Sequence, residues 1–523
     1  MKRITFITKS IFILAILFFI PVLLMAQKAN WQNLDLHKDG VFGISAEKAY
    51  DELLKGKTGV KVKVAVLDSG VDIDHEDLSA VIWKNPSEEK NGKDDDGNGY
   101  VDDVYGWNFL GSSIGNVNYD NLELTRLVRC YDEKFGGRDS AEIKISEQKD
   151  YEIYKDLKNK LTDKKLDTFK ELVSIGAVKN TLDSLVEIIG KDNPRSKDFK
   201  RLKLNDFSQE YLVSFLIHEL KKEPYSSLYY NMFGETMRYY KEQLQYHLNE
   251  QFNSRDTVGD NYKNVEERIY GNSDVVGPDA LHGTHVAGII AATRNNKKGI
   301  NGVADNVEII SVRCVPNGDE RDKDVANSIR YAVDKGAKII NMSFGKSYST
   351  NKKAVDEAVK YAMSKDVLLV HAAGNDNKNL EQEANFPNRL YESGGSAVAW
   401  LEVGASSWKA DSTLKAPFSN YGKTKVDVFA PGAAINSTVP GSKYQVQSGT
   451  SMAAPVVSGA AAILRSYYPN LTAVQVKEVI MKSAIPFNGE VVVDNGEKIR
   501  FSDLSVSGGI VNIYEALKLA STY

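Results

Sequence analysis

Cysteine is scarce in this chain: Cys130 and Cys314 are the only two among 523 residues. Two cysteines cannot form the disulfide framework that stabilises small secreted domains, although one bond between them stays open. Cys314 lies in an apolar run and is expected to pack as a small hydrophobic side chain. The fold must therefore depend on a packed core, and neither cysteine is predicted to act as a nucleophile.

An excess of charge of either sign is also absent. Lysine and arginine total 66 against 70 aspartate and glutamate, so the formal net charge is −4. Without a basic excess we expect no nucleic-acid binding, and no cationic amphipathic stretch indicates a membrane surface. Hydrophobic residues make up 42% and charged residues 26% of the chain, which is typical of a globular protein with a large core.

Long hydrophobic runs are missing beyond the N-terminus. There, Lys2 and Arg3 precede an apolar run over 11–25, and Ala26 is a small residue suited to cleavage. This layout is typical of a signal peptide, and the run is short for a membrane span, which needs about 20 residues. We expect removal of residues 1–26, no transmembrane anchor afterwards, and export to the periplasm or the medium; a retained anchor is the alternative.

The rest of the chain alternates strand-like and helical runs. The predicted strands are 61–67, 307–315, 338–344, 367–373, 396–405 and 426–429, and the predicted helices include 322–335, 351–364, 451–467 and 472–483. This alternation predicts an α/β fold: a mostly parallel sheet with helices on both faces. Ligands of such sheets bind at the carboxyl ends of the strands, where Asp68, Ser343 and Asn375 fall.

Residues 112–264 depart from this pattern. They are charged and rich in tyrosine, with few Gly or Pro, and their apolar residues recur at spacings of three and four. Helices are predicted at 151–161, 166–189, 207–222 and 227–252. We therefore predict an inserted all-helical subdomain whose two ends lie close together on the core. It is expected to bind a partner or gate the cleft, with passive decoration as the alternative.

Three Gly-rich blocks carry the polar groups of a serine nucleophile. Asp68 ends an apolar strand, His282 begins a Gly/Ala-rich helix, and Ser451 begins another helix, with Pro455 in its first turns. A serine hydroxyl is inert until a base takes its proton, and the base needs an acid to hold its tautomer. We predict Ser451 as nucleophile, His282 as general base and Asp68 as the orienting acid. Taken alone, Ser451 would be an ordinary helix N-cap.

The sequences around these residues resemble the subtilisin-like serine proteases, the subtilases of peptidase family S8. The resemblance covers about 60–110 and 275–520 and includes the chain order Asp, His, Ser. It implies a serine endopeptidase that acts on polypeptides and needs no cofactor for catalysis. Two features depart from the family: the helical insertion, and the short stretch before Asp68, which leaves too little chain for the usual folding pro-domain.

The resemblance also assigns two further segments. Asn375 follows an apolar run and matches the family's oxyanion block, so its amide is expected to stabilise the tetrahedral oxygen together with the N–H of Ser451. Ser343, Phe344 and Gly345 match the substrate-binding strand end, whose free backbone groups can pair with an extended peptide. Taken alone, Gly-Asn at 374–375 would be a turn.

An acidic turn over 94–103 predicts a different kind of site. Its Asp94, Asp96, Asn98 and Asp102 offer hard oxygen ligands that suit Ca²⁺. The spacing begins like an EF-hand, but the twelfth position is Tyr105 rather than the bidentate glutamate. We therefore predict a structural calcium site of another type, and a solvated acidic turn is the alternative. The His-x-x-His spacing that begins at His282 lacks the further ligands of a zinc site.

Together these features divide the chain into five parts. They are a signal peptide (1–26), an N-terminal lead with a helix (27–59), a first catalytic part (60–111), the helical insertion (112–264) and a second catalytic part (265–520). Two other classes of function compete with the peptidase. One is a pseudo-protease whose insertion binds a partner, and the other is a non-proteolytic acyl hydrolase with the same triad.

Overall fold

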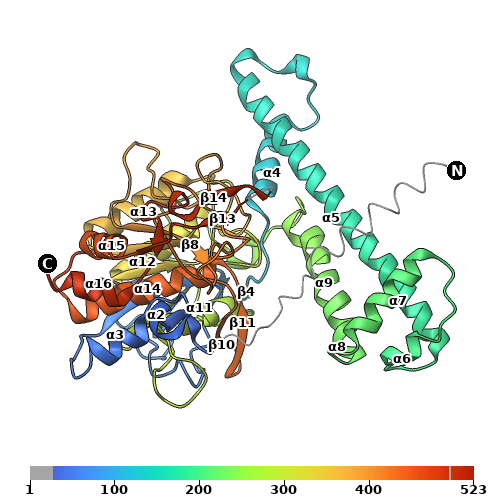
Figure 1. The fold of residues 1–523 in the computed structure, drawn as a ribbon. Coiled ribbons are helices and arrows are strands. Elements are labelled where there is room, and N and C mark those ends of the chain that lie inside the picture. Colours follow the sequence, from blue (N-terminus) through green and yellow to red (C-terminus); the bar gives the residue numbers. More distant parts are fainter. Residues whose placement is uncertain (1–27, 494–495) are drawn as a thin grey trace. The chain divides into compact units, whose positions relative to one another are not determined.

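The computed structural model describes residues 28–493 and 496–523 (Figure 1). The predicted signal peptide, 1–26, lies outside the described residues. The chain divides into two compact units. The first, here called the sheet unit, comprises Gln27–Glu123 and Asn253–Tyr523, and the second, the helical unit, is Leu124–Phe252.

A nine-stranded sheet forms the centre of the sheet unit, with the order β12-β15-β9-β8-β7-β6-β1-β5-β2. All neighbouring strands are parallel except β12 and β15. The strands are β1 Val62–Asp68, β2 Gly106–Asn108, β5 Val307–Arg313, β6 Ile339–Met342, β7 Leu368–Ala372, β8 Trp400–Ser406, β9 Val428–Pro431, β12 Ile485–Pro486 and β15 Gly509–Ile510. Parallel strands are buried on both faces, which explains why these sequences are continuous apolar runs rather than alternating ones.

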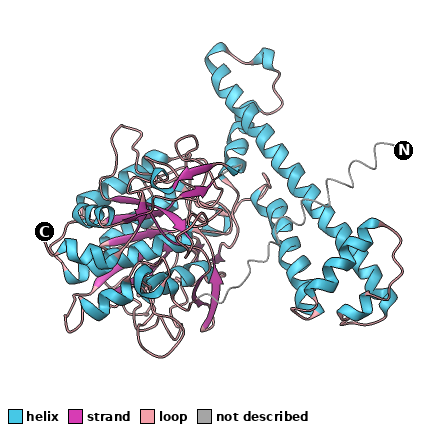
Figure 2. Ribbon diagram, viewed as in Figure 1, coloured by secondary structure: helices cyan, strands magenta, loops and turns pink. Residues whose placement is uncertain are grey.

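Helices cover both faces of this sheet, as Figure 2 shows for the cyan helices around the magenta strands. The principal ones are α3 Ala46–Glu52, α11 Leu281–Ala291, α12 Asp322–Asp334, α13 Lys352–Ser364, α14 Thr450–Tyr467, α15 Ala473–Lys482 and α16 Ile513–Ala520. Because side chains alternate along a strand, Val64 and Val66 of β1 pack in one core with α11 and α14, whereas Ala65 and Leu67 pack in a second core with α12 and α13. The predicted α/β fold is thus confirmed.

Smaller elements complete the sheet unit. They are α2 Leu36–Asp39, α10 Arg255–Val258 and the antiparallel pairs β3 Gly111–Ser112 with β4 Gly115–Asn116, β10 Ile435–Val439 with β11 Lys443–Gln447, and β13 Glu490–Val492 with β14 Lys498–Arg500. No strand pattern in the sequence predicts these hairpins. Within residues 28–493 and 496–523, no helix has both the length and the apolar character needed to cross a membrane.

The helical unit is built on α5, a helix of 42 residues from Gln148 to Ile189. The sequence predicts two helices here, but the polar residues 162–165 between them include no Gly or Pro, and the helix is continuous. Its other helices are α4 Glu123–Phe135, α6 Ser196–Phe199, α7 Phe207–Glu219, α8 Tyr225–Tyr229 and α9 Glu235–Glu242, with π-helical turns at Tyr230–Gly234 and Gln243–His247. The second half of α5 packs with α6, α7 and α8 in a core that includes Leu182, Leu216 and Phe233.

Buried ion pairs hold the two chain segments that lead to and from the helical unit. All of these pairs lie within the sheet unit. They are Asp120–Arg321 and Glu123–Lys346 on the outgoing segment, and Arg255–Asp324 and Asp260–Lys323 on the returning one. Arg321 and Lys323 lie at the start of α12, whereas Arg255 and Lys346 contact Asp324 and Asp322 of the same helix. Both segments are therefore fixed to the same part of the sheet unit.

Both cysteines are free thiols, so the bond that the sequence left open is not formed. Cys314 is fully buried, and this burial raises the pKa of its thiol well above the ordinary value. A thiol of that kind stays protonated at neutral pH and is a poor nucleophile.

Candidate active site

Asp68 and His282 contact each other although 214 positions separate them. Asp68 is the last residue of β1 and is 1% exposed, so the strand fixes its carboxylate. His282 is the second residue of α11, and its Nδ1 lies 2.7 Å from Asp68 Oδ1. The same oxygen accepts the backbone N–H of Ser69 at 2.8 Å. This contact leaves Nε2 of the imidazole as the atom that faces outward to act as a base.

Two glycines allow this close approach. Gly70 has φ +126°, and a Cβ there would lie 2.1 Å from the carbonyl oxygen of Val276. A Cβ on Gly283 would lie 2.2 Å from the carbonyl oxygen of Gly70 and 3.1 Å from Cβ of Asp68. A side chain at Gly283 would push α11 away from β1, and one at Gly70 would clash with the segment before α11, so both glycines are steric requirements of the contact.

The environment of His282 shifts its pKa upward. Burial alone would lower the pKa, but the charge of Asp68 and its hydrogen bond to Nδ1 outweigh that effect, and the pKa lies above the ordinary 6.5. The imidazole side chain is 36% exposed, so solvent and substrate can reach it. The carboxylate of Asp68 therefore stabilises the imidazolium form that His282 takes when it accepts a proton.

Ser451 is the second residue of α14, where unpaired backbone N–H groups and the helix dipole favour negative charge. Its hydroxyl donates to the carbonyl oxygen of Ser343 at 3.0 Å, and the Ser343 hydroxyl donates to the carbonyl oxygen of Ser451 at 2.9 Å. Pro455 explains the second bond, because it lacks the N–H that would otherwise bond to Ser451 four residues earlier. The proline thus frees that carbonyl for Ser343.

Asn375 lies in the turn after β7, close to the start of α14. Its Oδ1 accepts the backbone N–H of Thr450 at 2.8 Å and the Thr450 hydroxyl at 2.9 Å. With the carbonyl side fixed, the Nδ2 group faces Gly449: a Cβ there would lie 3.5 Å from Asn375 Nδ2 and 3.6 Å from the backbone N of Ser451. The side-chain nitrogen of Asn375 and the backbone nitrogen of Ser451 therefore both lie next to Gly449.

The structure brings Asp68, His282, Ser451 and Asn375 to the same edge of the sheet. Within the described residues, Asp68 and His282 are hydrogen-bonded, whereas the Ser451 hydroxyl points to Ser343 rather than to the imidazole. Such nucleophile–base bonds are often long before substrate binds. Two further groups support Ser343: Asn341, which begins the Asn-Met-Ser-Phe-Gly sequence at 341–345, and Ser458, to which no sequence motif points. Asn341 donates to the Ser343 hydroxyl at 2.9 Å and accepts from Ser458 at 2.8 Å.

Ser343, Phe344 and Gly345 follow β6 directly and border the nucleophile. The next residue, Lys346, exchanges two backbone hydrogen bonds with Phe386, each 2.9 Å long. Gly345 has no room for a side chain, because a Cβ would lie 2.6 Å from Asn385 Oδ1. A hollow of about 440 Å³ lies next to the triad, and Asp68, His282, Ser343, Asn118, Asp279 and Asn317 are among its lining residues.

His285 has a structural environment. Its Nε2 lies 3.1 Å from the carbonyl oxygen of Ile435 and 3.0 Å from that of Gln445, so it donates to the β10–β11 hairpin. Burial lowers its pKa to about 4, and the ring is neutral at pH 7. His285 therefore ties the start of α11 to the β10–β11 hairpin.

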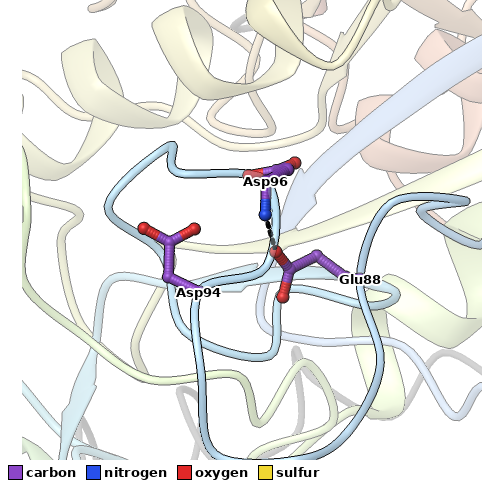
Figure 3. A group of neighbouring side chains, drawn as sticks. All are labelled: Glu88, Asp94 and Asp96. Atoms are coloured by element: carbon purple, nitrogen blue, oxygen red, sulfur yellow. Dashed lines mark hydrogen bonds between the residues drawn. The ribbon is translucent and has the colours of Figure 1, made fainter.

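The acidic turn forms a small carboxylate cluster, but with a different membership from the predicted one. Asp94 and Asp96 are joined by Glu88, and one carboxylate oxygen from each lies within 4.8 Å of the others (Figure 3). Asp102 instead accepts the backbone N–H groups of Asn91 and Gly92, both at 2.9 Å. The side-chain oxygen of Asn98 accepts the N–H of Tyr100 within its own turn. No spacing rule pointed to Glu88, which precedes the turn.

Comparison with known proteins gives a consistent picture. The model of the Subtilase family matches residues 59–508. A thermophilic serine proteinase of Bacillus sp. (strain AK1) is 41% identical over 209 residues, which are 40% of this chain and 48% of that protein. Thermitase of Thermoactinomyces vulgaris is 39% identical over 216 residues, which are 40% of this chain and 72% of that protein.

A solved structure of proteases from Pseudoalteromonas arctica PAMC 21717 aligns with a TM-score of 0.48 and 20% identity, covering 94% of this chain and 98% of that one. The chain spans about half the length of the first of the sequence relatives named above. Because the family model matches most of the chain, and its matched range contains all four residues of the candidate site, the chain belongs to the subtilase family.

Proposed function

We propose that this protein is an exported serine endopeptidase that hydrolyses peptide bonds through Asp68, His282 and Ser451, with Asn375 in the oxyanion hole. The observation that carries the proposal is the 2.7 Å contact between His282 Nδ1 and Asp68 Oδ1, made across 214 positions by two glycine-dependent turns. Membership of the subtilase family and the serine proteinases among its relatives support the same chemistry.

In the proposed mechanism, His282 Nε2 takes the proton of the Ser451 hydroxyl as that oxygen attacks the substrate carbonyl. The imidazolium that forms is stabilised by Asp68, which also keeps the proton of Nδ1 in place. Negative charge then develops on the carbonyl oxygen, where Asn375 Nδ2 and the backbone N–H of Ser451 can bind it. His282 returns the proton to the leaving amine, and water completes the cycle by the same route.

A fluorophosphonate probe tests the nucleophile directly, because it labels only an activated serine. We expect labelling of the parent at Ser451 and none of Ser451→Ala. The matched control is Ser466→Ala, a buried serine near the other end of the same helix. A parent that stays unlabelled while folded would favour a pseudo-protease instead.

Substrate panels separate a peptidase from an acyl hydrolase. The strand end at Ser343–Gly345 offers backbone groups to an extended chain, so longer peptides should be cleaved more efficiently than single-residue esters of the same acyl group. We expect kcat/KM to rise with the number of residues on the acyl side. Ester hydrolysis without peptide hydrolysis would contradict the proposal.

Export is proposed from the basic start and apolar run of residues 1–26. Expression in a bacterial host should yield a processed chain, and mass spectrometry of its N-terminus should find Gln27 as the first residue. An unprocessed chain that starts at Met1 and sediments with membranes would indicate a retained anchor.

We further propose that Glu88, Asp94 and Asp96 hold a structural Ca²⁺ ion. Glu88 is 3% exposed, and in the described part of the chain its Oε2 is buried without a hydrogen-bond partner. Its Oε1 accepts the N–H of Asp96 at 2.8 Å, as the dashed line in Figure 3 shows. A buried carboxylate oxygen needs a partner, and three hard oxygens fit calcium. A bound ion would stabilise the loop over residues 88–103.

Calcium titration tests this site through stability. A ligand that binds only the native state adds about 2.7 kcal/mol when present at 100 times its Kd. We expect Tm to rise with calcium in the parent and in Glu89→Gln, an exposed neighbour, but not in Glu88→Gln. A Tm that is equal in chelator and in millimolar calcium would contradict the site.

Finally, we propose that the helical unit limits which polypeptides reach the cleft. The outgoing segment supports this: Asn118 lines the hollow beside His282, and the N–H of Asp120 donates to the carbonyl oxygen of Asn317 at 3.0 Å. The chain that leads into the helical unit is therefore part of the wall of the proposed substrate site.

A further inference from the structure

Lys415 is a buried lysine with an unusual set of partners. It is 2% exposed, and its Nζ donates to Asn377 Oδ1 at 2.6 Å and to the carbonyl oxygen of Ala416 at 3.1 Å. Its ammonium also lies 5.5 Å from the centre of the Tyr421 ring. The other fully buried lysines, Lys323 and Lys346, each contact two carboxylates. For Lys415 no ion pair is found among the described residues.

A buried cation without a counter-charge is costly for stability. Removing an ammonium from water costs several kcal/mol, and only a well-placed anion returns most of it. Burial accordingly lowers the pKa of Lys415 to about 8. An apolar side chain of the same length would fill this position at less cost, so stability gives no reason for a lysine here.

The contact between Lys415 and Asn377 indicates a different reason for a lysine at this position. Asn377 has a left-handed backbone with φ +56°, and it belongs to the turn 374–378 that carries Asn375. Asn420 holds the same turn from the other side: it accepts the N–H groups of Asp376 at 3.0 Å and Lys378 at 2.8 Å. It also donates to the carbonyl oxygen of Ala373 at 2.8 Å. The segment 415–421 thus clamps the turn that holds the proposed oxyanion donor.

We propose that Lys415 is a positioning residue for oxyanion binding: by holding Asn377 it keeps the turn 374–378 in place, so that Asn375 Nδ2 stays directed at the point beside Gly449. The inference rests on the proposed peptidase function. Donors that are already in place stabilise the developing charge without reorganisation, and a displacement of about 1 Å can cost 10²-fold in rate. The lysine therefore lowers the stability of the fold but keeps this turn rigid.

A control for the loss of one positive charge is available in the same segment of the chain. Lys409 is exposed and lies six positions before Lys415, which makes it the matched control.

The first experiment compares Lys415→Met with Lys409→Met on a short peptide substrate. We expect Lys415→Met to lower kcat about tenfold, less than the 10²–10³ typical of losing an oxyanion donor outright. KM should stay within about twofold, and Tm should not fall, because an unpaired buried charge has been removed. Lys415→Gln keeps a neutral donor and should be intermediate; it serves as the second variant if the methionine variant does not fold. Lys409→Met should match the parent.

A double-mutant cycle with Asn375→Ala decides how Lys415 acts. If it acts through Asn375, Lys415→Met should change kcat by less than about twofold in the Asn375→Ala background. The same tenfold loss in that background, or no loss in the parent background, would overturn the inference. Failure of the proposed function is a separate outcome, because it would appear as a parent without peptidase activity or a Ser451→Ala variant that keeps it.

Discussion

The sheet unit and the helical unit both contain ion pairs, but they place them differently. Several pairs of the helical unit lie on helix surfaces, such as Lys155 with Glu152, whose side chains are 50% and 57% exposed. In the sheet unit the pairs beside the helical unit's two connections are buried, such as Lys323 with Asp260, both 0% exposed. Surface pairs contribute about 0–1 kcal/mol, whereas breaking a buried pair costs about 3–5 kcal/mol.

This difference indicates what each unit must hold fixed. The helical unit gains its stability from apolar packing along α5, and its charged residues keep its surface solvated. The sheet unit instead uses buried charges to fix the segments next to the hollow beside His282. We infer that the sheet unit requires precise positions of its side chains, whereas the helical unit needs only to stay folded. The following predictions test that contrast.

The largest effect is expected at the triad in the sheet unit. Ser451→Ala and His282→Ala should each lower kcat by about 10⁶-fold, and the double variant should be hardly worse, a magnitude taken from subtilisin. The reason is that nucleophile and base act as a unit. Steady-state kinetics on a peptide substrate measure it. Additive losses, or substantial turnover in Ser451→Ala, would contradict the assignment.

Asp68→Asn should lower kcat about 10⁴-fold, because the imidazole loses its tautomer and the partner of its charged form. It should also move the pH profile. His282 must be neutral to act as a base, and its pKa lies above 6.5, so the acid limb of kcat/KM in the parent should have its midpoint above 6.5. Without the carboxylate the pKa falls, and the midpoint should shift to lower pH. A midpoint that does not move would exclude His282 as the titrating base.

The sequence predicts the strands and main site residues of the sheet unit far better than the contacts that support them. Asp68, Asn375 and Ser451 could be found because each follows an apolar run or begins a helix in a Gly-rich turn, and such local patterns can be read without the fold. Glu88 could not be found, since its place beside Asp94 depends on a loop path that no periodicity encodes. Lys415 was missed for a related reason, because the sequence alone does not distinguish a buried lysine from a solvated one.

In the helical unit the sequence predicts the helices over 151–252, but it misses α4 and misplaces several helix ends. The polar stretch 162–165 suggested a break in α5, yet a helix can expose a polar turn without ending. The predicted helix 227–252 contains two π-helical turns, Tyr230–Gly234 and Gln243–His247, which local propensity does not encode. Apolar spacing thus determines which face packs, whereas tertiary contacts determine where each helix stops.

Stability measurements compare the two uses of charge directly. Lys323→Met removes the buried cation that contacts both Asp260 and Glu267 at 2.6 Å, while Arg255 stays as a partner of Asp260. It should destabilise the sheet unit by about 3 kcal/mol, the lower end of the range for a broken buried pair. Lys155→Met removes an exposed pair on α5 and should change the free energy of unfolding by less than about 1 kcal/mol. Urea unfolding of both variants measures this. Equal losses in the two variants would show that the contrast between the units is wrong.

The smallest effect on short-peptide turnover is expected when the helical unit itself is removed. A Gly/Ser linker that joins Glu123 to Asn253 should leave kcat/KM for a short peptide within about threefold, because the buried pairs of both connections stay in the sheet unit and loop length itself costs little entropy. Cleavage of large folded proteins should instead rise about tenfold if the helical unit restricts access to the cleft. The same replacement in a Ser451→Ala background is the control for a contaminating protease.

A changed oligomeric state without a change in substrate range would favour a role in partner binding. An enzyme that matches the parent in short-peptide turnover, substrate range and oligomeric state would make the helical unit a passive decoration. Loss of short-peptide turnover in a folded product would mean that the helical unit, and not only its connections, fixes the active site, which would remove the distinction between the two units.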